Sequence, residues 1–141
     1  MYIARHMNEK QVQHVVFYWV KTASHDYETM LSLFESKRYS DCLFFGHLVL
    51  EKILKALVVM ATKKQAPFVH DLVRLQEVVK LNLAEEEVEL LNKVNDFNIR
   101  SHYPDYKLQF YKTCTKKYTE EHLEKIIALY KNLCRNLKQK K

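Results

Sequence analysis

Residues 39 to 64 read YSDCLFFGHLVLEKILKALVVMATKK, and this stretch decides the fold. As a helix it is apolar on nearly every side, so it is expected to lie inside the molecule with other helices around it. Its polar residues are the exception, because His47, Glu51 and Lys55 follow one another at four-residue steps and lie along one edge. Lys52 lies beside them. We therefore predict a buried central helix with a polar seam formed by His47, Glu51, Lys52 and Lys55.

The central stretch is not expected to span a membrane. Lys52 and Lys55 interrupt it, so no run approaches the roughly 20 apolar residues that a bilayer requires. Residues 1–10 contain no hydrophobic signal core. We therefore expect a cytoplasmic protein that does not contact a membrane.

The composition predicts an all-α protein. The chain has 141 residues, of which 48% are hydrophobic, which suits one domain over residues 1–141. Strands joined by tight turns need residues that accept positive φ, and the chain contains a single glycine, Gly46. One glycine also excludes the glycine-rich phosphate loops of Walker and dinucleotide-binding proteins.

Cysteine and charge further restrict the function. Cys42, Cys114 and Cys134 are odd in number and lack C-x-x-C spacing, so neither a disulfide framework nor a structural zinc site is expected. We predict no metal and no cofactor. Residues 107–141 carry 10 basic and 3 acidic side chains, against 13 and 14 in residues 1–106. The basic C-terminal segment is compatible with an anionic partner, although lysines at a helix end are commonly solvated.

Apolar residues at three- and four-residue steps predict four helices besides the central one. They are expected over residues 9–36, 71–81, 85–103 and 119–137. Expected caps are Ser40 or Asp41 for the central helix, Asp71 for the short helix after it and Thr119 for the last helix. The first two helices should form an antiparallel hairpin. The one long connection, residues 101–118, is predicted to be a basic aromatic loop.

The polar seam has two interpretations. Its residues can form contacts within the helix, each worth a few tenths of a kcal/mol, or they can meet a group from outside. A metal is the weakest option, because no third ligand accompanies His47 and Glu51. His70 and Asp71 likewise either cap a helix or help to hold an anion at its start.

The segment around Arg100 also has two interpretations. Arg100, His102 and Tyr103 lie where a helix ends, which is a common position for functional groups, but an arginine there can also tether the loop through an aspartate. The following tyrosines and lysines suit stacking on bases and pairing with phosphates. They also suit a loop whose rings pack over helix ends, which is the more common arrangement.

Three of these stretches resemble the HEPN domain, named for higher eukaryotes and prokaryotes nucleotide-binding. They are HLVLEKILKAL at residues 47–57, His-Asp-Leu at 70–72, and Arg100 with Tyr-Pro-Asp at 103–105, within a match from 24 to 137. The resemblance implies an up-and-down bundle of four to five helices, usually a homodimer, often encoded beside a minimal nucleotidyltransferase in toxin-antitoxin-like or nucleotide-handling systems. It implies a polar groove lined by Glu51, Lys52, Lys55, His70, Arg100 and Tyr103, to which the seam adds His47.

Ribonucleases of the HEPN family carry an arginine followed, after four to six residues, by a histidine. The corresponding positions after Arg100 hold Asp105, Tyr106 and Lys107, so this motif is absent. We therefore predict a module that binds a nucleotide, RNA or another anionic ligand, or a nucleotidyltransferase partner. The alternatives are a metal-independent ribonuclease that uses Arg100 with His102 or His70, and a purely structural dimer.

Overall fold

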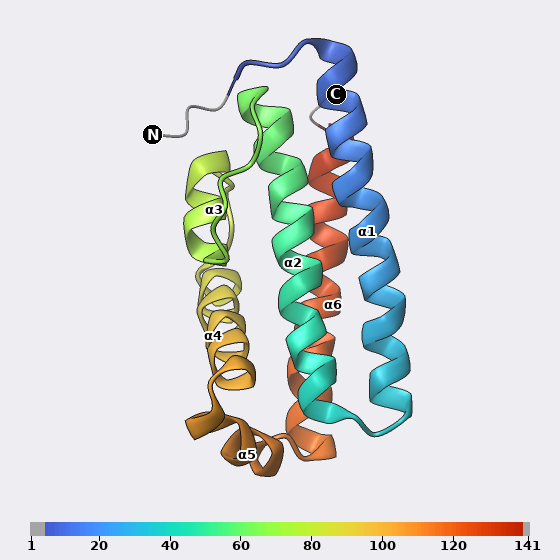
Figure 1. Cartoon of the computed structure of the whole chain (residues 1–141), viewed down its shortest axis with the longest axis vertical. Coiled ribbons are helices and arrows are strands. Elements are labelled where there is room, and N and C mark those ends of the chain that lie inside the picture. The colour runs from blue at the N-terminus through green and yellow to red at the C-terminus, as the bar shows by residue number, and fades with distance from the viewer. Residues whose placement is uncertain (1–4, 140–141) are drawn as a thin grey trace.

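The computed structural model describes residues 5–139, and this part of the chain is almost entirely helical (Figure 1). Its helices are α1 (Glu9–Glu35), α2 (Tyr39–Thr62), α3 (Leu72–Val79), α4 (Glu85–His102), α5 (Pro104–Thr113) and α6 (Lys116–Gln139). α1, α2 and α6 run the length of the molecule, and α3 and α4 together cover the same length beside α2. The all-α up-and-down bundle is therefore confirmed, with six helices in the described residues where the sequence pattern predicted five.

α2 is the central helix, as predicted. α1 lies on one side of it, α3 and α4 on the other, and α6 behind (Figure 1). Leu50, Ile53, Leu54 and Leu57 are fully buried. Gly46 has a packing role, because a Cβ atom there would lie 2.8 Å from Ile126 Cδ1 of α6. The glycine thus allows α6 to approach the middle of α2 closely.

In the hairpin of α1 and α2, α1 begins at Glu9 as predicted, but the start of α2 differs from the prediction. α1 starts with a capping box in which Asn8 Oδ1 accepts from the Gln11 backbone N–H at 2.9 Å. The predicted cap of α2 by Ser40 or Asp41 is wrong, because α2 begins at Tyr39 and has no side-chain cap. Asp41 therefore lies in the first turn, where its Oδ2 accepts from Arg38 Nε at 3.4 Å.

α3 is fixed at its start by two side chains. Asp71 is the N-cap, as predicted, and its Oδ1 accepts from the Val73 backbone N–H at 3.0 Å. Asn95 of α4 completes the arrangement by donating to Asp71 Oδ1 at 2.9 Å and accepting from the Leu72 backbone N–H at 3.0 Å. The position of the residue before Asp71, which is His70, is therefore set by both α3 and α4.

The loop predicted over residues 101–118 is wrong, because most of this segment forms α5 and the first turn of α6. Pro104 is the first residue of α5, a position that proline favours. Phe110 is fully buried against Phe97 and holds α5 against α4. The predicted cap Thr119 is buried inside α6, and Thr115 Oγ1 instead accepts from the Tyr118 backbone N–H at 3.2 Å.

None of the helices in the described part of the chain is both long and apolar enough to cross a membrane.

Candidate functional site

Glu51 lies at the centre of a group of ionisable side chains on α2. Its side chain is 10% exposed, and its Oε2 accepts from Lys55 Nζ at 3.0 Å. Its Oε1 lies 3.0 Å from His70 Nδ1 and 3.7 Å from His47 Nδ1. The four residues His47, Glu51, Lys55 and His70 are called the Glu51 cluster below. Both interpretations of the seam describe part of it, since Glu51 pairs with Lys55 within α2 and also meets His70 from outside α2.

His70 reaches the cluster because the chain after α2 turns back along the helix. α2 ends at Thr62, and its C-cap Lys63 adopts the left-handed conformation with φ of 60°. The following segment brings the His70 backbone carbonyl to His47 Nε2, at 2.9 Å. A carbonyl only accepts, so His47 carries its proton on Nε2 and donates it to His70.

This tautomer leaves His47 Nδ1 as an unprotonated acceptor. The atom is buried and has no hydrogen-bond partner in the described structure, while the neighbouring carboxylate oxygen is also an acceptor. Burial, which disfavours the charged form, lowers the pKa of His47, although Glu51 acts in the opposite direction. His47 Nδ1 and Glu51 Oε1 therefore face each other at 3.7 Å as two buried acceptors without a proton between them.

His70 is the outward-facing member of the cluster. Its side chain is 74% exposed, although its Nδ1 is bonded to the buried carboxylate of Glu51. A carboxylate only accepts, so His70 Nδ1 carries a proton and Nε2 is left for a group from outside. A buried acid that orients an exposed imidazole can support proton transfer, or the binding of a phosphate when the ring is protonated.

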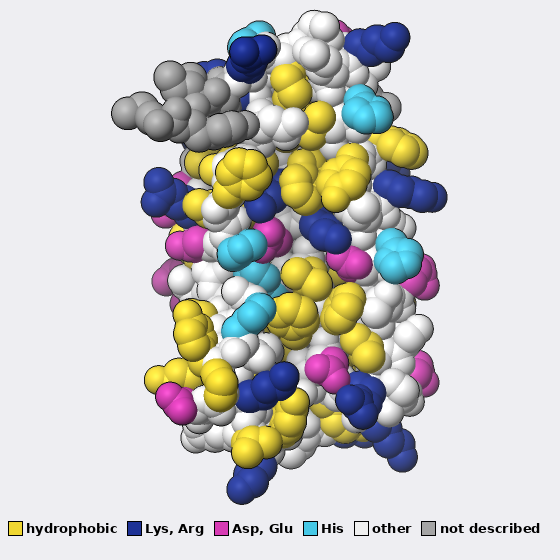
Figure 2. Space-filling model, viewed as in Figure 1, with side chains coloured by type: hydrophobic (Ala, Val, Ile, Leu, Met, Phe, Trp, Pro, Cys, Tyr) yellow, Lys and Arg dark blue, Asp and Glu magenta, His cyan; other side chains and the backbone are white. Residues whose placement is uncertain are grey.

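α1 also contributes side chains beside the Glu51 cluster, and the sequence did not predict them. Asp26 Oδ2 lies 2.6 Å from Lys52 Nζ, and the indole ring of Trp19 lies 5.4 Å from Lys55 Nζ. Tyr18 packs edge-on against Trp19. Figure 2 shows this face of the molecule. Histidines lie along the line where α2 meets α3 and α4, and side chains of both charges lie on the side of α1.

The structure does not join Arg100 to the Glu51 cluster. Arg100 Nη2 donates to Thr113 Oγ1 at 3.2 Å, and its guanidinium lies 5.0 Å from the Phe110 ring. Its nearest acid is Asp96, at 4.0 Å. Of the two interpretations, the tether describes Arg100 best, with Thr113 and Asp96 as its partners. Tyr103 lies exposed between α4 and α5.

His102 is the residue of this segment that reaches α2. Its ring packs edge-on against Phe44 with 5.2 Å between centroids, and Phe44 precedes His47 by one helical turn. Arg100 and His102 are two residues apart on α4 and therefore point to different sides of it. Within one chain, neither His102 nor His70 is thus placed beside Arg100 as the ribonuclease alternative requires.

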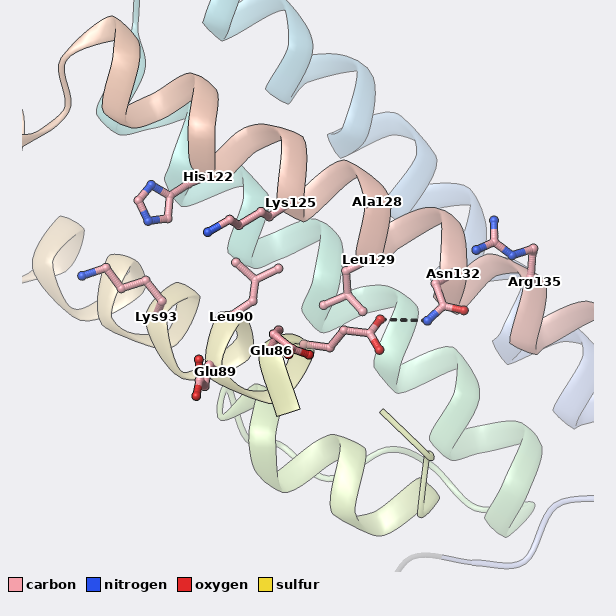
Figure 3. A pocket seen from close by; sticks show the side chains of 11 residues that line it. Glu86, Glu89, Leu90, Lys93, His122, Lys125, Ala128, Leu129, Asn132 and Arg135 are labelled. Carbon is pink, nitrogen blue, oxygen red and sulfur yellow. Dashed lines mark hydrogen bonds between the residues drawn. The ribbon is translucent and has the colours of Figure 1, made fainter. Parts of the chain in front are cut away.

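A groove of about 800 Å³ lies between α4 and α6, and the sequence did not predict it (Figure 3). Glu86, Glu89 and Lys93 of α4 face His122, Lys125 and Arg135 of α6 across Leu90 and Leu129. Near Glu86, Glu87 Oε2 accepts from Asn132 Nδ2 at 2.9 Å. The sequence contains no signal for this groove, because each wall alone has the pattern of a solvated helix face. It contributes no residue to the Glu51 cluster.

Residues 5–139 contain no group of three His, Cys, Asp or Glu side chains placed to hold a metal ion. The chemistry available to the Glu51 cluster from its own side chains is that of hydrogen bonds, charge and proton transfer.

The buried imidazole predicts how stability depends on pH. Because burial lowers the pKa of His47 below its ordinary value of 6.5, the unfolded chain binds this proton more readily than the folded one. The free energy of unfolding should therefore fall as the pH drops below about 6.5. Urea unfolding between neutral pH and mildly acidic pH checks this. His47→Gln should flatten the slope and His14→Ala, at an exposed position, should not; equal slopes in all three proteins contradict the assignment.

Comparison with known proteins places the chain in a family. A family model of the HEPN domain matches residues 16–140. The fold is similar to that of ST0689, an archaeal HEPN homologue, with a TM-score of 0.69, 16% identity, and coverage of 86% of this chain and 97% of that one. It is also similar to TT1696 from Thermus thermophilus, with a TM-score of 0.71, 18% identity, and coverage of 89% and 98%. No curated protein sequence matches the chain. The chain belongs to the HEPN domain family.

Proposed function

We propose that this HEPN domain binds a nucleotide at the Glu51 cluster. The single observation that carries the proposal is the pairing of a buried carboxylate, Glu51, with an exposed imidazole, His70. A solvated surface histidine needs no such partner. Burying the acid is costly unless it is paired, and Lys55 supplies the compensating charge. The arrangement holds His70 Nε2 toward a ligand in a fixed orientation.

The phosphate is assigned to His70. Glu51 stabilises a proton on Nδ1, so a second proton on Nε2 makes the ring a cation whose outer N–H can donate to a phosphate oxygen. Lys52 lies on the next position of α2 after Glu51 and is 24% exposed, so its ammonium can exchange Asp26 for a ligand oxygen. Lys52 provides the positive charge of the proposed site, and His70 adds to it only when its ring is protonated.

The base is assigned to Tyr18, which lies outside the cluster. Tyr18 is exposed beside Trp19 and offers a ring face on which a base can stack. A nucleotide combines a phosphate and a base in one molecule, whereas a simple anion supplies only the first.

Thermal unfolding with a panel of nucleoside mono-, di- and triphosphates tests the proposal. A ligand at 100 times its Kd stabilises the folded state by about 2.7 kcal/mol. For a domain of this size we expect the midpoint temperature to rise by several degrees, since 1 kcal/mol corresponds to roughly 4 °C. His70→Ala should abolish the rise, whereas His14→Ala, which removes an exposed histidine from α1, should retain it. No stabilisation by any nucleotide at millimolar concentration contradicts the proposal.

We further propose that the domain works as a homodimer with a minimal nucleotidyltransferase, in a toxin-antitoxin-like or nucleotide-handling system. The support is that the chain belongs to the HEPN family, since the resemblance to this family implies that arrangement. Light scattering of the purified protein tests the dimer, and co-purification with the product of a neighbouring nucleotidyltransferase gene tests the partner. A monomeric protein without such a neighbour contradicts both parts and leaves nucleotide binding to its own test.

A further inference from the structure

A hollow of about 400 Å³ lies between the last turns of α4 and the helix that follows it, α5. Asp96, Ile99 and Arg100 line it from α4, and Tyr106 and Gln109 line it from α5. On each helix these residues are three or four positions apart, so they lie on one face. We call this surface the α4–α5 hollow. It shares no residue with the Glu51 cluster or with the groove between α4 and α6.

The cation of the α4–α5 hollow is Arg100, and most of its N–H donors are unused. Its side chain is 19% exposed, and the ring of Phe110 lies 5.0 Å from its guanidinium. Nη2 donates to Thr113 Oγ1 at 3.2 Å, but a hydroxyl group carries no charge. A guanidinium has several donors in a planar fork, and burying a cation is costly unless an anion is paired with it. Arg100 therefore retains donors that suit a carboxylate.

The anion of the α4–α5 hollow is Asp96. Its Oδ2 lies 4.0 Å from Arg100 Nη1, whereas a hydrogen bond between charged groups spans about 2.7–2.9 Å. Within residues 5–139 the carboxylate of Asp96 accepts no hydrogen bond, and its side chain is 47% exposed. The hollow thus holds a cationic donor and an anionic acceptor side by side, and neither is fully satisfied by the other.

Apolar surface flanks these two charges. Tyr106 is 49% exposed and Ile99 is 47% exposed, one on each side of the hollow. Gln109 adds a neutral amide. A few polar groups set beside apolar and aromatic side chains are typical of sites for small molecules, and the volume lies within their range of about 300–1,000 Å³.

We propose that the α4–α5 hollow binds a free α-amino acid with an apolar or aromatic side chain. The ligand carboxylate pairs with Arg100, its ammonium pairs with Asp96, and its side chain lies against Tyr106 and Ile99. An α-amino acid carries both charges on one carbon atom, which matches the close spacing of the two protein charges. A phosphate is disfavoured because Asp96 repels a second anion. A peptide is disfavoured because its amide bonds remove one of the two charges at each end.

Titration of the isotope-labelled full chain with L-phenylalanine, followed by the NMR shifts of its backbone amides, tests the proposal. We expect shifts in residues 96–109 and not in residues 47–55, at ligand concentrations up to about 10 mM, which largely fill a site with a Kd of about 1 mM. N-acetyl-L-phenylalanine lacks the ammonium and L-phenylalaninamide lacks the carboxylate. Each should bind about 10-fold more weakly, because each loses a hydrogen bond between charged groups.

Asp96→Asn provides the sharpest variant, because its half-exposed side chain can be changed without disturbing the bond of Arg100 to Thr113. It should weaken L-phenylalanine by about 10-fold and should not weaken N-acetyl-L-phenylalanine, so the preference between these two ligands disappears. The matched control is Glu89→Gln, which removes an exposed acid of the same helix outside the hollow and should bind as the wild type does.

Several results would overturn the proposal. They are absence of shifts with L-phenylalanine, equal weakening in Glu89→Gln, and equal affinity of the wild type for L-phenylalanine and N-acetyl-L-phenylalanine, because the hollow is then a plain carboxylate site. His70→Ala separates the hollow from the nucleotide site. It should remove the thermal stabilisation by nucleotides and leave the affinity for L-phenylalanine intact. Loss of amino-acid binding in His70→Ala would place the ligand at the Glu51 cluster and contradict the assignment to the hollow.

Discussion

Glu51→Ala is expected to lower the free energy of unfolding by about 3–5 kcal/mol, because it leaves the ammonium group of Lys55 buried without its partner. The Lys55 side chain is 7% exposed and lies 3.0 Å from Glu51 Oε2. The ring of Trp19 remains near the ammonium but replaces only part of the lost stabilisation. The midpoint of thermal unfolding should therefore fall by about 10 °C or more.

A second variant separates the lost charge pair from the lost packing. Replacing both partners, in Glu51→Leu with Lys55→Leu, removes the charges together and should cost much less than Glu51→Ala, since buried ion pairs are often replaceable by apolar residues. Glu28→Ala, at an exposed acid on α1, is the matched control and should change stability by no more than about 0.5 kcal/mol. Urea denaturation measures all three. If Glu51→Ala is as stable as Glu28→Ala, the buried ion pair of Glu51 with Lys55 does not exist in solution.

The expected loss of stability in Glu51→Ala also limits the use of this variant in nucleotide-binding experiments. A nucleotide-binding defect in Glu51→Ala is uninformative when the variant is partly unfolded. For that reason the nucleotide test rests on His70, whose exposed side chain can be removed with little loss of packing.

The central helix was predictable because its signal is local. Apolar residues on every side of α2 and polar residues at four-residue steps along one edge both follow from the helical repeat alone. The link from Glu51 to His70 is different, because 19 residues separate them. Only the resemblance to the HEPN domain placed them in one groove, and no spacing in the sequence does so.

Asp26 was missed although a signal exists. It lies in the row Trp19, Ala23, Asp26 and Met30, which steps by three or four residues along the inner face of α1. An acid in an otherwise apolar row is expected to have a buried partner. Which cation it meets, Lys52, depends on how α1 packs against α2, and the sequence does not provide that register.

α5 was missed because its sequence has no apolar repeat. Phe110 is its one fully buried residue, and the exposed tyrosines and lysines around it have the composition of a loop. The helix depends on Pro104 at its start and on the contact of Phe110 with α4, which is a tertiary effect. With α5 missed, the start of α6 was predicted at Thr119, whereas the helix begins at Lys116, directly after Thr115.

Phe97 is the residue through which α4 holds both α5 and α6, so Phe97→Ala is expected to have an effect as large as that of Glu51→Ala. Its ring is fully buried, with centroid distances of 5.6 Å to Phe110, 5.4 Å to His122 and 6.3 Å to Tyr118. Truncating a buried phenylalanine costs about 3–5 kcal/mol, which combines lost transfer free energy and a cavity.

The loss of the Phe97 ring should destabilise α5 more than the other helices, because the one buried side chain of α5, Phe110, packs on Phe97. Hydrogen exchange of the amides in residues 104–113 should accelerate more in Phe97→Ala than exchange in α2, which also packs against α1, α3 and α6. Ile99→Ala, at a half-exposed position of α4, is the control and should leave both exchange and the urea midpoint near wild type. Uniform acceleration throughout the chain would show that α5 is no less stable than the bundle.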